Sequence, residues 1–512
     1  MFAKRYRPDE LIEIIAAQSY SPEIVAYVKK VEHQPTLAHY LKSKPKLGVT
    51  GTIAKDYVEA TTPNAVPYIS TKQVKGLHAY IEDAKYISKE ADIEWKKCRV
   101  DDGDIVINKS GDVGAAAVLC CAPYKYANSV SDIISIKLSE TAPIDRDFLV
   151  VYLNSPFGQK QLQRLSGGAI FSHVSLHAIP HINVYAADVL AQKYIGDKVR
   201  QAERLRAWAN ALSISVAAHF SGLVKNPLPA RVSWVAKKED LDPYRINPKQ
   251  YNPVVLDLIQ RAKDKCARLD PLSTLVGTRQ IAGGATPKGA QYFDKGILFA
   301  RVQNVKPLRL DLSDAVYIDQ FADEELARSR CAADDIILTI TGYPGTASLV
   351  TEEDLPVNIN QHSVRFNIKD GVDPGYVCAA LNSKFLKYQV DRLAIGGTRD
   401  ALDYPSVGRL LIPRYEAEVE TTIGEQARYV NAAIKLSQRL TNAAKLLVEA
   451  LIEGQLSEAE LIAAEQALQA GNDQLDRRLL NRLKIDGVDG QGPALFGDLD
   501  ELYQLLTQAE GD

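Results

Sequence analysis

Methionine, tryptophan and cysteine are scarce in this chain of 512 residues, with one, three and six copies. The cysteines are scattered and form no C-x-x-C pair, which predicts reduced thiols rather than a disulfide framework or a zinc site. No apolar run is long enough to cross a bilayer, and the N-terminus lacks an apolar signal region. We therefore expect a cytoplasmic protein, with no membrane partner, of roughly two to four domains.

Catalytic signatures are missing as well. Segment 104–114, "DIVINKSGDVG", runs from a strand-like stretch into a lysine and two glycines, but the phosphate-loop pattern G-x-x-x-x-G-K-[ST] occurs nowhere. An adenine-methylation motif, a nucleophile elbow and a nuclease carboxylate–lysine cluster are also absent from the sequence. His173, His177 and His181 have the spacing of metal ligands on a helix, but Pro180 interrupts such a helix. We expect no catalytic residue and no metal ligand.

Charge is distributed unevenly along the chain. Residues 453–512 hold 13 Asp and Glu against 4 Lys and Arg, a net −9, so the remainder holds 51 against 57, a net +6. An acidic tail on a mildly basic body is compatible with nucleic-acid contact by the body. It is equally compatible with a solvated tail on a neutral enzyme.

What the chain does contain is a long internal duplication. Shifted by 231, residues 86–119 align without a gap with 317–350, and 11 of the 34 positions are identical, against roughly two expected from ordinary residue usage. Further segments pair at offsets of 231 and then 228: 66–76 with 297–307, 153–168 with 381–397, and 195–200 with 423–428. The chain is thus two copies of one module of about 230 residues, too long for a solenoid repeat.

The duplication decides how to interpret the glycine segment. Lys109 faces Ile340 and Ser110 faces Thr341, whereas both glycines and the preceding apolar run persist. A phosphate site needs its cation, but a turn needs only its glycines. We predict a structural hairpin or turn in each copy, with a variable tip that reads something different in each half.

Each module is predicted to have a β-rich part and a helical part. Short β-branched runs such as "VPYIS", "DIVIN", "ILFARV" and "DIILTI" predict strands. Segments 145–165 and 373–393 each predict one helix that ends just before a Gly-Gly loop. Two long helices follow, with apolar seams from Ile195 to Val216 and from Ile423 to Leu451, and we expect them to pair antiparallel.

Charged residues and the C-terminal tail complete this pattern. Lys198, Arg206 and His219 lie on or beside the first seam, and we expect their partners on the second helix. In the tail, a capping box at Ser457 and the segment 498–508 predict two helices.

Polar residues on the matching segments and at the Gly-Gly loops are the candidates for binding. Arg, Lys, Gln and Asn can make paired contacts with base edges, and hydroxyls and lysines serve phosphates. The candidates are Lys72, Gln73, Lys75, Lys109, Ser110, Ser172 and His173 in the first copy, and Arg301, Gln303, Asn304, Lys306, Thr341, Tyr343, Thr398 and Arg399 in the second.

Two β-rich modules, each with a "GDI"-like strand, a glycine turn, a helix with a Gly-Gly loop and a long helix, resemble the specificity (S) subunit of type I restriction-modification systems. The resemblance covers roughly residues 10–452. It implies an α+β fold in which two tandem target-recognition domains, related by pseudo-twofold symmetry, are separated by two long antiparallel coiled-coil-like helices. The implied boundaries are 1–185, spacer helix 186–222, linker 223–234, 235–413, spacer helix 414–453, and an acidic helical extension 454–512.

The resemblance also implies a function and a set of partners. Each module would read one half of a bipartite site in double-stranded DNA, and the chain would have no catalysis and no cofactor of its own. Two DNA adenine methyltransferase subunits would supply S-adenosylmethionine chemistry, and restriction or translocase subunits would add ATP- and Mg²⁺-dependent steps. The alternatives are an enzyme with an unrecognised nuclease or methyltransferase site in one module, and a scaffold protein that does not bind DNA.

Overall fold

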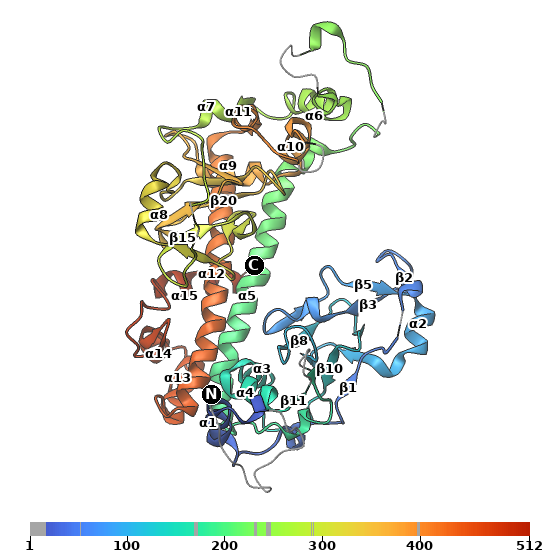
Figure 1. Ribbon diagram of the computed structural model, residues 1–512, viewed down its shortest axis with the longest axis vertical. Coiled ribbons are helices and arrows are strands. Elements are labelled where there is room, and N and C mark those ends of the chain that lie inside the picture. Colours follow the sequence, from blue (N-terminus) through green and yellow to red (C-terminus); the bar gives the residue numbers. More distant parts are fainter. Residues whose placement is uncertain are drawn as a thin grey trace. The chain divides into compact units, whose positions relative to one another are not determined.

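The computed structural model describes residues 17–51, 53–167, 173–229, 233–241, 247–287, 289, 291–396 and 400–511. The chain divides into two compact units. Unit 1 joins Met1–Arg204 to Leu436–Gly511, and unit 2 is Leu205–Lys435. Both units combine strands with helices (Figure 1), so the chain has the predicted α+β character.

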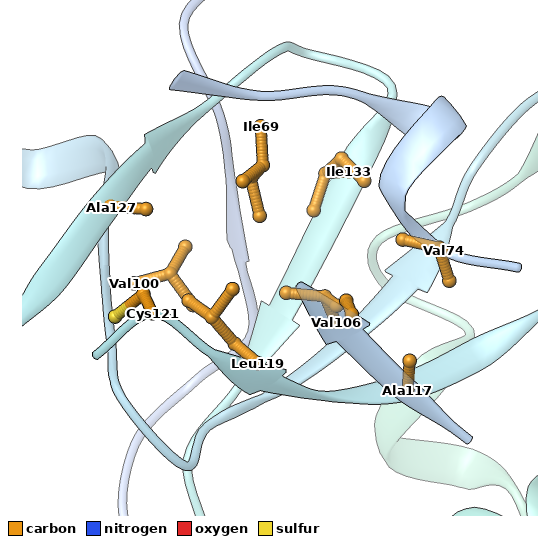
Figure 2. Packing of buried hydrophobic residues seen from close by; sticks show 10 residues of the cluster. Ile69, Val74, Val100, Val106, Ala117, Leu119, Cys121, Ala127 and Ile133 are labelled. Atoms are coloured by element: carbon orange, nitrogen blue, oxygen red, sulfur yellow. The ribbon is translucent and has the colours of Figure 1, made fainter. Parts of the chain in front are cut away.

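Unit 1 contains two sheets that share one hydrophobic core. Their strand orders are β1-β10-β7-β8-β4 and β2-β5-β3-β9-β6. The strands are β1 (Lys46–Leu47), β2 (Tyr57–Val58), β3 (Val66–Ile69), β4 (His78–Tyr80), β5 (Lys85–Ile87), β6 (Arg99–Asp101), β7 (Ile105–Asn108), β8 (Ala116–Cys120), β9 (Tyr126–Ser129) and β10 (Ile133–Ile136). Val106 and Leu119 of the first sheet pack with Ile69 and Val100 of the second (Figure 2). Burying each such side chain contributes about 1.5–3 kcal/mol.

Unit 2 repeats the central part of this topology. Its sheets have the orders β14-β22-β19-β20 and β18-β15-β21, so β22-β19-β20 corresponds to β10-β7-β8. In both units the second sheet holds one parallel pair, β3 with β9 and β15 with β21. The strands are β14 (Ala282–Gly283), β15 (Ile297–Ala300), β18 (Val316–Ile318), β19 (Ile336–Thr339), β20 (Ala347–Leu349), β21 (Val357–Ile359) and β22 (Ser363–Phe366). Two short pairs accompany them, β13 (Arg268–Pro271) with β23 (Leu411–Arg414) and β16 (Val305–Lys306) with β17 (Arg309–Leu310).

The helix expected before each Gly-Gly loop is two helices, so that part of the prediction was wrong. In unit 1, α3 (Arg146–Asn154) ends at Ser155 and α4 (Pro156–Arg164) begins at a proline, which suits the first turn of a helix. In unit 2, α9 (Pro374–Leu381) and α10 (Lys384–Leu393) are separated in the same way, with Ser383 capping α10. The apolar periodicity continues across both breaks, which is why it predicted one helix.

Shorter helices flank the sheets in both units. Two of them, α1 (Pro22–Val31) and α6 (Pro253–Ala262), are equivalent helices that start at a proline after a side-chain cap. The others are α2 (Lys89–Glu94), α7 (Leu272–Leu275), α8 (Gln320–Glu325) and α11 (Tyr404–Gly408).

The two long helices are α5 (Val189–Ser221) and α12 (Ala417–Ile452), and each contributes residues to both units. The apolar residues of their predicted seams, from Ile195 to Val216 and from Ile423 to Leu451, are buried. The exceptions are Leu212 and Ile434, which are half-buried. In unit 2, Trp208 of α5 packs on Tyr429 of α12 with ring centroids 5.8 Å apart. The two long helices therefore contact each other within this unit, as predicted.

A repeated clamp joins each long helix to its module. Arg200 of α5 binds Asp145, the N-cap of α3, at 3.1 Å, and Arg428 of α12 binds Asp373, the N-cap of α9, at 2.9 Å. The carboxylate lies against a glycine, and a Cβ on Gly196 would lie 2.4 Å from an oxygen of Asp145. The glycine and the arginine that segments 195–200 and 423–428 share are thus explained by their contacts with this carboxylate.

One stretch of the described chain, Val189–Val224, is long and apolar enough to cross a membrane, contrary to the expectation from the sequence, and 28 % of its most apolar 18 residues are buried. Core helices of globular proteins meet the same criteria. Leu205, Trp208 and Phe220 of this stretch are buried inside unit 2. We therefore interpret it as the expected spacer helix.

The acidic extension is folded and docks inside unit 1. It comprises α13 (Glu458–Gln469), α14 (Gln474–Arg482), the hairpin β24 (Leu483–Lys484) with β25 (Gly487–Val488), and α15 (Leu499–Gly511), which include both predicted helices. Asp476 of α14 forms a buried ion pair with Lys198 of α5 at 2.7 Å. The expectation that Lys198 finds its partner on the second long helix was therefore wrong.

Candidate nucleic-acid interface

A glycine hairpin forms the centre of the candidate surface in each unit. Strand β7 pairs antiparallel with β8, and β19 pairs in the same way with β20. Gly111 has φ of 75° and its counterpart Gly342 has φ of 83°, the left-handed region that favours glycine. The prediction of a structural hairpin or turn in each copy is confirmed.

The segment after each Gly-Gly loop lies beside the hairpin tip. In unit 1 the backbone N–H of Val174 donates to the carbonyl of Lys109 at 3.2 Å. In unit 2 the N–H of Leu402 donates to the carbonyl of Ile340 at 2.8 Å. These pairs are equivalent at the offsets of the duplication, so both modules bring the same two predicted recognition segments together.

The candidates of unit 1 are divided between exposed and structural positions. Lys72, Lys75 and His173 are exposed. Gln73 accepts the backbone N–H of Ser70 in a capping box, so its carbonyl oxygen is engaged locally. The half-buried pair at the hairpin is Lys109 and Ser110, and the Ser110 hydroxyl donates to Asp132 at 2.6 Å.

In unit 2, three candidates converge on one carboxylate. Arg301, Gln303 and Asn304 all donate to Asp314, at 3.4, 3.1 and 2.6 Å. The hydrogen bond from Gln303 is the largest cause that lowers the pKa of Asp314, and Asn304 and the Arg301 charge add to it. Asp314 therefore stays ionised and orients these side chains.

The burial and hydrogen bonds of Asn304 exclude it as a candidate for contacting DNA bases. It is fully buried, its amide N–H₂ is bound to Asp311 and Asp314, and its oxygen accepts the N–H of Arg301. Such a side chain has no group left for a base edge. Asn304 is the counterpart of Gln73, and both cap an equivalent turn.

The remaining candidates of unit 2 lie near the hairpin. Tyr343 is 80 % exposed at the tip, and Thr341 and Lys306 are half-buried. Ser172, Thr398 and Arg399 lie outside the described residues. A role in binding remains a prediction for every candidate other than Asn304.

Sequence reasoning missed a set of polar residues that hold each module together. Asn154 pairs its side-chain amide with the backbone of Ala116, at 3.2 and 2.7 Å, and Asn382 does the same with Ala347, at 3.1 and 2.8 Å. Gln161 grips the backbone of Asn183, as its counterpart Gln389 grips Leu411. The signal was present, because these residues are identical in the two copies.

In the described part of the chain, we find buried thiols but no cluster of reactive side chains. Burial raises the pKa of the Cys120 and Cys121 thiols to about 12, which disfavours the nucleophilic thiolate. No group of three or more His, Cys, Asp or Glu residues is placed to hold a metal within the described segments. His177 and His181 line one cavity, which is described below.

Comparison with known proteins gives matches among solved structures alone. No family model and no curated protein matches the chain. It is similar to the S subunit of a type I restriction-modification system from M. genitalium, at 11 % identity and a TM-score of 0.42, over 82 % of this chain and 94 % of that one. The HsdS subunit from Thermoanaerobacter tengcongensis aligns over 85 % of this chain and 97 % of its own length, at 14 % identity and a TM-score of 0.25.

A third similar structure comes from work on complex assembly and conformational transition of the type I restriction-modification system. It aligns over 85 % of this chain and 98 % of its own length, at 14 % identity and a TM-score of 0.27. These similar structures belong to the same family, the type I S subunits, that the duplicated motifs resemble. With TM-scores below 0.5, these likenesses transfer no residue roles to this chain.

Proposed function

We propose that the chain is the DNA-specificity subunit of a type I restriction-modification system. The observation that carries the proposal is the duplication of a whole module with different polar tips. Both copies share the central strand order of each sheet, the glycine hairpin and the loop contact, whereas Lys109 and Ser110 are replaced by Ile340 and Thr341. A bipartite reader needs one scaffold used twice and two different sets of reading side chains.

The candidate surfaces contain groups suited to both parts of DNA recognition. Lys72 and Lys75 are exposed cations that suit phosphates. Arg301 and Gln303 are the residue types that pair with guanine and adenine in the major groove, and Asp314 limits their freedom before binding. The exposed ring of Tyr343 suits apolar contact with a base or sugar.

The length of the long helices supports spacing between two readers. Helix α5 has 33 residues, which span about 50 Å at 1.5 Å per residue. One helical turn of DNA is about 34–36 Å. A helix of this length can hold two recognition modules over successive major-groove segments.

The proposed complex divides recognition from chemistry. This chain would recruit two adenine methyltransferase subunits that bind S-adenosylmethionine, and restriction subunits would bring ATP and Mg²⁺. Burial of the Cys120 and Cys121 thiols raises their pKa and disfavours the thiolate, which is consistent with this division.

Selection from a random duplex library by the full chain tests the proposal. We expect enriched sequences with two constant blocks separated by a spacer of fixed length, and binding that weakens as salt rises. A single block would contradict the two-reader model. Absence of duplex binding would favour a scaffold protein, and cleavage or methylation by the isolated chain would favour an enzyme.

A further inference from the structure

One cavity in unit 1 is lined by His177 and His181, two histidines that are not part of the candidate interface. It has a volume of about 540 Å³ and lies between the turn Leu37–Tyr40 with the segment that follows it and the turn Ile179–His181. Its lining residues are Ala38, Leu41, Ser43, Lys44, Pro45, Leu176, His177, Pro180 and His181.

The two walls of the cavity are joined by backbone hydrogen bonds. The N–H of Leu37 donates to the carbonyl of Ile182 at 2.7 Å, and the N–H of Val184 donates to the carbonyl of Pro35 at 2.8 Å. An isolated bridge between Thr36 and Asn183 lies between them. These bonds hold the two turns against each other, and Ser43 and Lys44 lie in the segment that follows the first turn.

The lining favours an anion that carries an apolar part. Lys44 carries positive charge, the side chains of Ser43, His177 and His181 can donate hydrogen bonds, and none of the nine lining residues is acidic. The other five lining residues are apolar, so the cavity offers a surface for a base or sugar beside a polar rim for a phosphate.

The equivalent place in unit 2 is built differently. At the offset of 228, His177 and His181 correspond to Pro405 and Arg409. Helix α11 packs on α7 there, and a Cβ on Gly408 would lie 3.2 Å from the Cβ of Ser273. The two histidines of the cavity therefore belong to the first copy alone and are not part of the duplicated scaffold.

We infer that this cavity binds a phosphate-bearing group of about one nucleotide, with Lys44, His177 and His181 on the phosphate. The ligand is either a free nucleotide or a nucleotide within a DNA strand. In the second case the inference rests on the proposed function and adds one DNA-binding site to the first module. In the first case it is independent of DNA recognition.

Calorimetric titration of the full chain with AMP tests the free nucleotide. The test variant combines Lys44→Gln, His177→Gln and His181→Gln, and the control is His33→Gln, a histidine whose side chain is 88 % exposed and which is not among the lining residues. For a free nucleotide, we expect the triple variant to bind AMP at least tenfold more weakly and the control to bind as the wild type does. Lys44, His177 and His181 are exposed, so thermal unfolding should be unchanged.

Measuring duplex DNA binding over a series of salt concentrations tests whether the bound nucleotide belongs to a DNA strand. If the group belongs to DNA, the slope of log affinity against log salt should fall by about one for each phosphate that the triple variant no longer neutralises. The inference is overturned if the triple variant matches the wild type both in AMP binding and in salt slope. A chain that binds AMP through these residues but has no sequence preference on DNA would retain the cavity site and refute the proposed function.

Discussion

The buried ion pair between Lys198 and Asp476 allows a quantitative test of how the extension docks. The two side chains are 0 % and 1 % exposed, and Nζ lies 2.7 Å from Oδ1. Tyr194 and Tyr503 also donate to the same carboxylate, at 2.6 and 2.5 Å. Asp476 thus accepts from one ammonium and two hydroxyls, and removing Lys198 leaves a buried carboxylate without its counter-charge.

Removing one partner of a buried pair costs more than the pair itself contributes. We expect Lys198→Ala or Asp476→Ala to lower the free energy of unfolding by about 3–5 kcal/mol. The double variant Lys198→Met/Asp476→Leu removes both charges and fills the space, so it should cost far less than the sum of the single changes. The control is Glu510→Ala, which breaks the exposed pair with Arg204 and should cost about 0–1 kcal/mol.

Acid should release the extension by the same mechanism. Burial acts to raise the pKa of Asp476, but Lys198 and the hydrogen-bond donors prevail and lower it below its usual range. The stabilisation from this carboxylate is therefore complete above its unfolded pKa of about 4 and is lost as pH falls through its lower folded pKa. Denaturant titrations at pH 7 and below pH 4 measure both effects. Single variants that lose less than about 1 kcal/mol would refute the buried-charge argument.

Three further predictions concern the hairpin, the extension and the proposed interface. Gly342→Ala should cost about 1–2 kcal/mol from backbone strain alone, whereas Gly345→Ala should cost more because its Cβ would lie 2.9 Å from Val390; denaturant unfolding measures both. Deleting 456–512 should leave the selected DNA sequence unchanged but lower the melting temperature; an altered sequence would contradict this. Arg301→Ala should weaken the second half-site by about 1–3 kcal/mol and relax one base if the guanidinium pairs with guanine; uniform weakening on all sequences would indicate a phosphate contact.

The repeated sequence made much of the scaffold predictable. Glycine pairs that persist between copies, as at Gly111 and Gly342, identify backbone that must turn, and both positions have positive φ. Apolar seams likewise identified the two long helices. Periodicity could not locate the break at Ser155, because a helix that stops and restarts on the same core keeps its apolar spacing.

The candidate site was less predictable, because a polar side chain in a loop has two possible uses. Asn304 has the chemistry of a base-reading residue, but its position three residues after Arg301 makes it a cap. Lys198 was correctly placed near the seam, yet its partner is 278 residues away in the sequence. Only tertiary structure brings such groups together, as it does for Lys44 with His177 and His181.

Exchange of one module for the other tests the central claim most directly. Replacing residues 66–184 by residues 297–412 gives a chain with the second reader in both positions, and the clamp residues Asp145 and Asp373 are equivalent in the exchange. Selection from a random duplex library should then return two copies of the second half-site as an inverted repeat, in place of two different blocks. A folded exchange variant that still selects the original pair of blocks would contradict the claim that each module reads its own half.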